Sequence, residues 1–124
     1  MADEPEDSFQ QFKFEILGDA VYEDFQGLWE PLWYANHKFA DLAQAEREAL
    51  AERALRELLE EELIYFVDFG PETRIPSSEP APLNMSEAQA AIAGDSWRGL
   101  PPREARIFFG GTMVGERAAR KSSP

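Results

Sequence analysis

Residues 51–69 read AERALRELLEEELIYFVDF, and this stretch decides the fold. Its first half places alanine and leucine at helical spacing (positions 51, 54, 55, 58 and 59), which gives a helix with one apolar face. From Leu63 onward the residues are mostly β-branched or aromatic, as is typical of a buried strand. Gly70 and Pro71 then end that strand. A long helix that runs directly into a strand predicts an α+β domain.

The other elements follow from shorter patterns. The long helix should begin at Asp41, which can form a capping box with Gln44, and end near Glu61, where glutamates crowd the last turn. The further elements expected are a half-buried strand at 12–16, a helix from 29 or 30 to 37, an extended loop at 70–84, a short helix from a capping box at 86–89 to Gly94, a strand at 105–109, and a terminal helix at 112–120. Residues 112–120 fit a hairpin return strand almost as well. The strands at 63–69 and 105–109 should pair antiparallel.

The chain length of 124 residues is that of a single domain. We expect residues 1–8 to be a disordered acidic tail, residues 9–120 to form one domain, and residues 121–124 to be a second tail. No apolar run reaches the roughly 18 residues that span a bilayer, and the first seven residues are acidic where a signal peptide would be basic. These features predict a cytoplasmic protein that does not enter a membrane.

Charge is the strongest global feature of the sequence. Asp and Glu number 24 against 12 Lys and Arg, a net charge of −12. The excess lies in residues 1–72, which carry 19 acids and 5 bases, whereas residues 73–124 carry 5 acids and 7 bases. A field this negative repels phosphate backbones and attracts basic partners. The simpler interpretation, that acidity only keeps the chain soluble, stays open.

Catalytic and metal-binding patterns are missing from the sequence. There are no cysteines, and His37 is the only histidine, placed near the end of a predicted helix where it suits the terminal carbonyls. No nucleophile, base and oxyanion donor can be named together, and no acidic loop has the spacing of a calcium site. We therefore predict a protein that is not an enzyme and carries no cofactor or metal.

Aromatic side chains are concentrated between residues 22 and 39. Tryptophan and tyrosine are common both in small cores and at protein interfaces. We assign Trp29 and Trp33 to the core and expect Trp97 to fold back onto it. Tyr34 is kept as a candidate partner contact.

Several segments resemble winged-helix domains. Residues 54–64, ALRELLEEELI, look like the junction between the third helix and the wing, and Thr112-x-x-Gly115-Glu-Arg looks like the segment after the last wing strand. Residues 29–33 and 86–97 are similar to small winged-helix-like bacterial proteins of unassigned function. The resemblance covers about residues 28–118 and implies two main helices on a small antiparallel sheet, with an elongated wing that contains a short helix. It also implies a homodimer paired through terminal helices.

The sequence departs from the winged-helix pattern at two places, Glu62 and the segment 41–62. Glu62 stands where such families usually carry glycine, and a left-handed glutamate costs about 1 kcal/mol, which predicts a different helix end. Residues 41–62 look like one helix without a turn, and its end is acidic, so binding of that surface in a DNA groove is not expected.

Two functions remain as hypotheses. The first is an acidic protein-binding domain, of the immunity, antitoxin or inhibitor type, that docks a basic protein through Tyr34, Glu57, Glu60 and Glu61. The alternative is a winged-helix DNA-binding transcription regulator that meets DNA through the basic segment 103–121 or the wing. Gel-shift assays and the effect of replacing Arg117 and Arg120 distinguish them.

Overall fold

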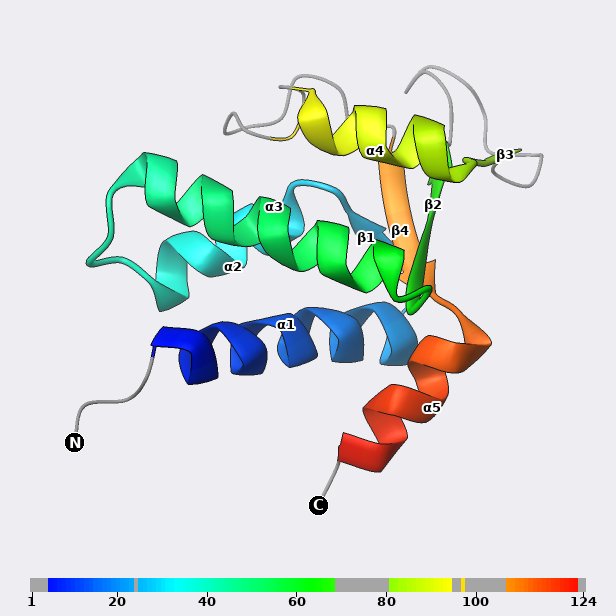
Figure 1. The fold of residues 1–124 in the computed structure, drawn as a ribbon, viewed down its shortest axis with the longest axis horizontal. Coiled ribbons are helices and arrows are strands. Elements are labelled where there is room, and N and C mark those ends of the chain that lie inside the picture. Colours follow the sequence, from blue (N-terminus) through cyan, green and yellow to red (C-terminus); the bar gives the residue numbers. More distant parts are fainter. Residues whose placement is uncertain (1–4, 24, 69–80, 95–96, 98–106, 123–124) are drawn as a thin grey trace.

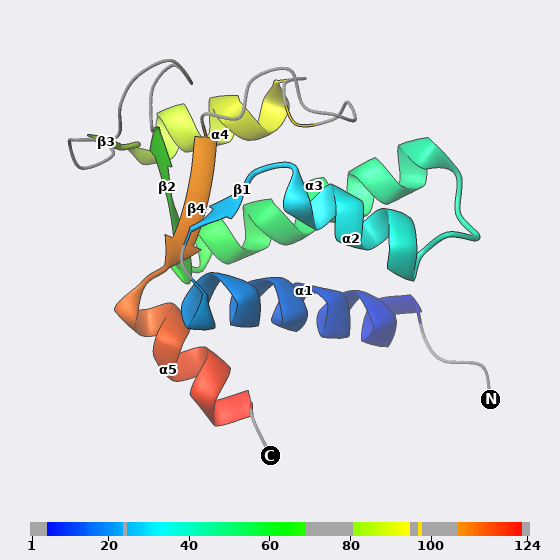
Figure 2. The same ribbon diagram turned by 180° about the vertical axis from the view of Figure 1, so that it is seen from behind.

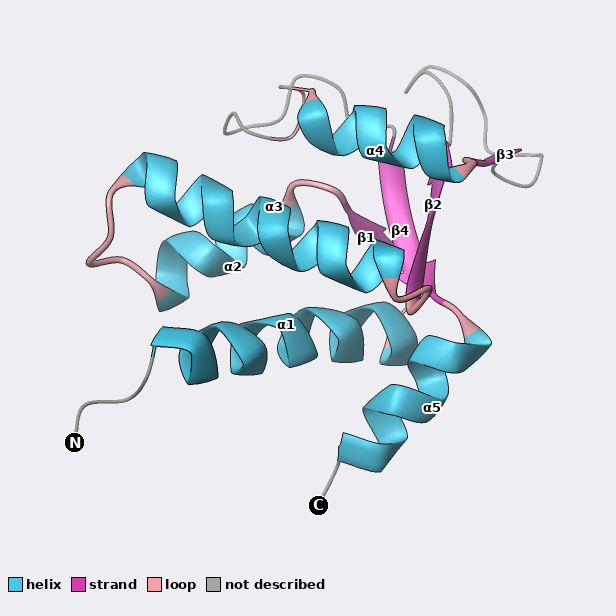
Figure 3. Ribbon diagram, in the orientation of Figure 1, coloured by secondary structure: helices cyan, strands magenta, loops and turns pink. Residues whose placement is uncertain are grey.

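Helices and a small antiparallel sheet make up an α+β fold (Figures 1 and 3). The computed structural model describes residues 5–23, 25–68, 81–94, 97 and 107–122. Its helices are α1 (Pro5–Tyr22), α2 (Glu30–Lys38), α3 (Gln44–Glu60), α4 (Met85–Ala93) and α5 (Met113–Ser122). Its strands are β1 (Gln26–Gly27), β2 (Ile64–Asp68), β3 (Ala81–Pro82) and β4 (Ile107–Gly111).

The strands form one sheet in the order β1-β4-β2-β3, with antiparallel neighbours. The predicted pairing of 63–69 with 105–109 is confirmed, because β2 and β4 pair with Phe66 opposite Phe109. The expected loop at 70–84 contains β3 near its end. Residues 69–80 and 98–106, which include the rest of that loop and the start of the predicted strand 105–109, lie outside the described residues.

Among the described residues, an apolar cluster joins the helices to the sheet. Its largest buried side chains include Phe12 from α1, Leu55 from α3 and Phe109 from β4, each 1% exposed or less. Trp97 is also 1% exposed, and its indole N–H donates to the carbonyl of Ile92. The expectation that Trp97 folds back onto the core is therefore confirmed.

Helix α1 replaces the strand that the sequence predicted at 12–16, and that prediction is wrong. The apolar positions of α1 that are buried are Phe9, Phe12, Ile16, Leu17 and Ala20, a spacing that belongs to a helix. Phe14, which created the local alternation, is 47% exposed. As a result three helices, rather than two main ones, precede the two long strands.

Element ends also differ from the predictions. Residues 5–8 are helical and not part of a tail, and α5 continues through residues 121 and 122. Helix α3 starts at Gln44 with Ala43 at its N-cap and no side-chain cap, so the capping box at Asp41 is wrong. Helix α4 is confirmed, but its capping box is built by Asn84 and Glu87. Helix α2 and the terminal helix are confirmed.

The junction between α3 and β2 involves two residues that the sequence singled out, Glu62 and Thr112. Glu62 takes a left-handed conformation (φ 60°), and the N–H groups of Glu62 and Leu63 donate to the carbonyls of Leu59 and Leu58, which closes the helix as a Schellman motif. Thr112 binds this junction: its hydroxyl donates to the Glu62 carbonyl (2.6 Å) and its N–H to the Leu63 carbonyl (3.0 Å). The expectation that Glu62 would change the helix end is wrong.

Replacement of Glu62 by glycine should stabilise the protein. Glycine adopts a left-handed backbone without a steric cost, so we expect the free energy of unfolding of Glu62→Gly to rise by about 0.5–1 kcal/mol. Urea denaturation measures it. Glu62→Gln is the control, because it removes the same charge without relieving the backbone; equal stabilisation by both variants would assign the effect to charge instead.

Candidate functional site

The four residues predicted to contact a partner lie in two separate places. Tyr34 is half-buried on α2, where its ring packs on Phe12 (centroids 5.7 Å apart). Glu57, Glu60 and Glu61 lie at the C-terminal end of α3 and its cap. Tyr34 lines one hollow and Glu61 lines another, so the structure does not bring the aromatic and acidic candidates together.

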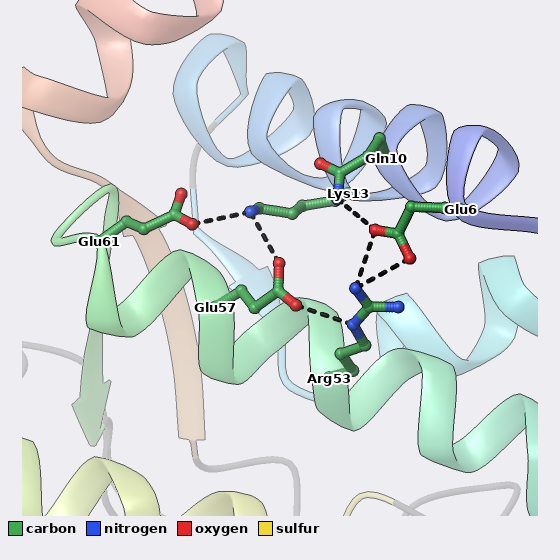
Figure 4. Close-up of polar contacts among 6 residues, drawn as sticks. All are labelled: Glu6, Gln10, Lys13, Arg53, Glu57 and Glu61. Carbon is green, nitrogen blue, oxygen red and sulfur yellow. Dashed lines mark hydrogen bonds and ion pairs between the residues drawn. The ribbon is translucent and has the colours of Figure 1, made fainter.

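Two of the three glutamates are engaged within the molecule, in an ion-pair chain between α1 and α3 (Figure 4). Lys13 Nζ lies 2.9 Å from both Glu57 Oε1 and Glu61 Oε2. Arg53 joins the other oxygen of Glu57 (2.8 Å) to Glu6 (2.8 Å). The ion-pair chain thus alternates in sign, and of the three predicted glutamates only the exposed Glu60 stands outside it.

The ion-pair chain shifts the pKa values of its members. Burial lowers the pKa of Lys13, but hydrogen bonds to Glu61 and Glu57 outweigh this and leave it raised. Burial raises the pKa of Glu57, but hydrogen bonds to Lys13 and Arg53 bring it below the usual value. Both charged forms are therefore stabilised by folding. This acidic surface is partly neutralised, which weakens its candidacy as a docking site for cations.

A second acidic site is lined by residues of the C-terminal half of α1, of α2 and of the sheet. Figure 2 shows how these elements are arranged. The site is a hollow of about 320 Å³, which we call the acid–aromatic pocket. The pocket is lined by Ile16, Asp19, Gln26, Glu30, Pro31, Trp33, Tyr34, His37 and Phe109. These lining residues include two carboxylates and neither lysine nor arginine.

Aromatic packing places one wall of the acid–aromatic pocket. Pro31 in the first turn of α2 starts the helix after Trp29. The ring of Trp29 lies against Gly27, where a Cβ atom would come within 2.3 Å of it. Trp29 then stacks edge-to-face between Phe108 and Trp33 (centroids 5.4 and 6.4 Å away). Trp33 remains 47% exposed, so its assignment to the core is wrong.

The carboxylates of the pocket are not compensated by neighbouring cations. Among the described residues neither Asp19 nor Glu30 takes part in an ion pair, although Glu30 accepts a hydrogen bond from the Gly27 N–H. Burial raises the pKa of Asp19, and the negative charges of Glu23, Glu30 and Glu15 raise it further. Asp19 also lies in the last turn of α1, where the helix dipole disfavours negative charge. A bound cation would offset the repulsion between these carboxylates and the unfavourable interaction with the dipole.

The sequence offered little to identify this site. Asp19 and Glu30 are separated by a segment that was expected to end a strand and begin a helix, so nothing placed them on one hollow. One feature was available. Residues 19–30 include Asp19, Glu23 and Glu30 but neither lysine nor arginine, and they overlap the aromatic segment 22–39. Tyr34 alone among the predicted contacts belongs to the pocket.

Two other hollows among the described residues are less uniform in charge. A larger one, about 660 Å³, lies beside the turn between α2 and α3 and mixes Lys38 and Arg53 with Asp41 and Glu46. A third, about 340 Å³, contains Lys13 and Glu61 of the ion-pair chain. In the part of the chain that the structure describes, His, Cys, Asp and Glu form no group of three that could hold a metal ion, and no described helix has the length and apolar character needed to cross a membrane.

Comparison of the chain with protein-family models, with curated protein sequences and with solved structures finds no match to any of them.

Proposed function

We propose that this chain is an acidic protein-binding domain, not an enzyme, that docks a basic protein partner as immunity proteins, antitoxins and inhibitors do. The observation that carries this proposal is the acid–aromatic pocket, which is lined both by carboxylates without an ion pair among the described residues and by an exposed tryptophan. Carboxylates speed encounter with a basic surface, and aromatic anchors hold the complex. The net charge of −12 adds a long-range attraction for such a partner.

We further propose that the fold is winged-helix-like and that α4 belongs to an elongated wing between β2 and β4. Support comes from the chain order, in which α1, β1, α2 and α3 precede the two long paired strands. Two residues of the resemblance lie at the third-helix junction: Thr112 donates a hydrogen bond to the Glu62 carbonyl, and Gly115 packs against the backbone of Leu63. Pairing of two copies through α5 is also a proposal, suggested by the resemblance alone.

The alternative, a DNA-binding transcription regulator, has one supporting observation. Helices α2 and α3 follow each other with a short connection between them, as the helices of a helix-turn-helix do. However, α3 lies between α1 and α4 (Figure 1), and its most exposed charged residues are Glu46, Arg53 and Glu60. Arg53 is bound to Glu6 and Glu57. A mixed, net negative surface of this kind is a poor contact for phosphates.

Affinity purification followed by reconstitution tests the proposal. At low salt the tagged chain should retain one basic protein, and the two purified components should form a stoichiometric complex in size-exclusion chromatography. The affinity should fall by on the order of tenfold at high salt, because screening weakens attraction between exposed charges. Retention of duplex DNA that is lost in Arg117→Gln with Arg120→Gln, with no protein partner, would instead establish the regulator.

A further inference from the structure

The acid–aromatic pocket has the size and chemistry for a single long cationic side chain. Its volume of about 320 Å³ lies at the small end of the range for ligand pockets. Ile16 and Phe109, both buried, come from α1 and β4 and supply an apolar floor. The exposed ring of Trp33 and the half-buried ring of Tyr34 supply the flat surface on α2. Asp19 and Glu30 bring charge from two different elements.

This combination of lining residues favours an organic cation over a metal ion as the ligand. Divalent ions need several oxygen ligands at short distance, and the described residues contain no such group. A guanidinium group, by contrast, stacks on aromatic rings and binds carboxylates with paired N–H groups. The lining disfavours an anionic ligand, because it contains Asp19 and Glu30 and neither lysine nor arginine.

We propose that the acid–aromatic pocket receives an arginine side chain of the basic partner, with its guanidinium between the Asp19 carboxylate and the ring of Trp33. This inference rests on the proposed function and specifies its contact. The charge complementarity is local: Asp19 has three carboxylates around it (Glu15, Glu23 and Glu30), and only Glu15 has a basic partner among the described residues, Lys38 at 3.3 Å. An arginine in this position also faces the C-terminal end of α1, whose dipole favours a cation.

A peptide pair tests the inference without knowledge of the partner. One short, otherwise uncharged peptide carries a central arginine; its twin carries citrulline, which has nearly the same shape but no charge. Binding is followed by NMR through the indole N–H of Trp33, assigned with Trp33→Phe. We expect saturable shifts of this signal with the arginine peptide and at least fivefold weaker binding of the citrulline peptide.

Two variants with the same change in charge locate the contact. Asp19→Asn should weaken binding of the arginine peptide by about fivefold. Glu60→Gln removes an exposed carboxylate that does not line the pocket, so it should leave the affinity within about twofold of wild type.

Three results would each overturn the inference: no saturable shift of Trp33, equal binding of the citrulline peptide, or equal weakening by the two variants. These failures differ from failure of the proposed function. If a basic protein still forms the salt-sensitive complex while the peptide does not bind at Trp33, the protein-binding function stands and the pocket is not its arginine site. If no basic protein is found, the proposed function fails whatever the peptide does.

Discussion

Gly115→Ala should unfold at a temperature roughly 10 °C below wild type. An added Cβ atom at this position would come within 2.0 Å of the Leu63 carbonyl oxygen and 2.9 Å of its carbon. Both atoms are backbone, and they belong to the junction that Thr112 also binds. The start of α5 must therefore move away from the α3–β2 junction, and we expect a loss of about 2–4 kcal/mol.

Gly18→Ala is the matched control for this prediction. Gly18 is also a helical glycine, in the interior of α1, but a Cβ atom there would have no neighbour within 4 Å. Alanine favours the helix by up to about 1 kcal/mol, so this variant should be slightly more stable than wild type. Thermal unfolding followed by circular dichroism measures both. A Gly115→Ala protein with the wild-type midpoint would show that α5 does not approach Leu63 this closely.

The same junction shows what the sequence predicts well. The apolar stripe of residues 51–59 extends over several turns, so its helical period is unambiguous, and Ala51, Ala54, Leu55, Leu58 and Leu59 are all buried. The following strand has a composition that a helix would not favour. The contact of Thr112 and Gly115 with this junction joins residues about 50 positions apart. In the sequence, only the resemblance to winged-helix domains singled out Thr112 and Gly115. The contact with the junction gives the physical reason for these two residues.

Helix α1 shows why a short pattern misleads. Phe12, Phe14 and Ile16 alternate with charged residues, but only Phe12 and Ile16 are buried. Phe14 lines the hollow beside α5, so an apolar residue at the surface produced the false strand period. A window long enough to include Phe9 and Ala20 contains the helical period instead. Apolar residues at the surface are common, which limits every short pattern in the same way.

The error in α1 also misplaced the candidate site. With residues 12–16 taken as a strand, nothing placed Lys13 beside Glu57 and Glu61, although it lies within 2.9 Å of both. The glutamates therefore looked like a free acidic surface. Asp19 was taken as the end of that strand, so its place beside the same hollow as Trp33 had no basis in the sequence. The sequence could therefore predict the chemistry of the site, which is acidic and aromatic, but not its position.

Lys13→Met should be the most informative change in the ion-pair chain, with an expected loss of about 2 kcal/mol at neutral pH. Methionine keeps the aliphatic volume of a side chain that is only 12% exposed. It removes the cation that Glu57 and Glu61 share, and Glu57 keeps only its second partner, Arg53. Lys38→Met is the control, because it removes the same charge from a longer pair with Glu15 (3.3 Å). Its cost should be below about 1 kcal/mol.

The pH dependence distinguishes a charge effect from lost packing. The pKa of Glu57 is held below its usual 4.5 by Lys13 and Arg53 despite burial, so its contribution to stability is complete above that value and is lost as the pH falls through the folded pKa. The pKa of Lys13 is raised above 10.5 by Glu61 and Glu57 despite burial, so its contribution is complete below 10.5 and is lost as the pH rises through the folded pKa. The stability difference between wild type and Lys13→Met, measured by urea denaturation, should be constant between these limits and shrink beyond both. A difference that stays the same in acid would mean that Lys13 acts through its aliphatic chain alone.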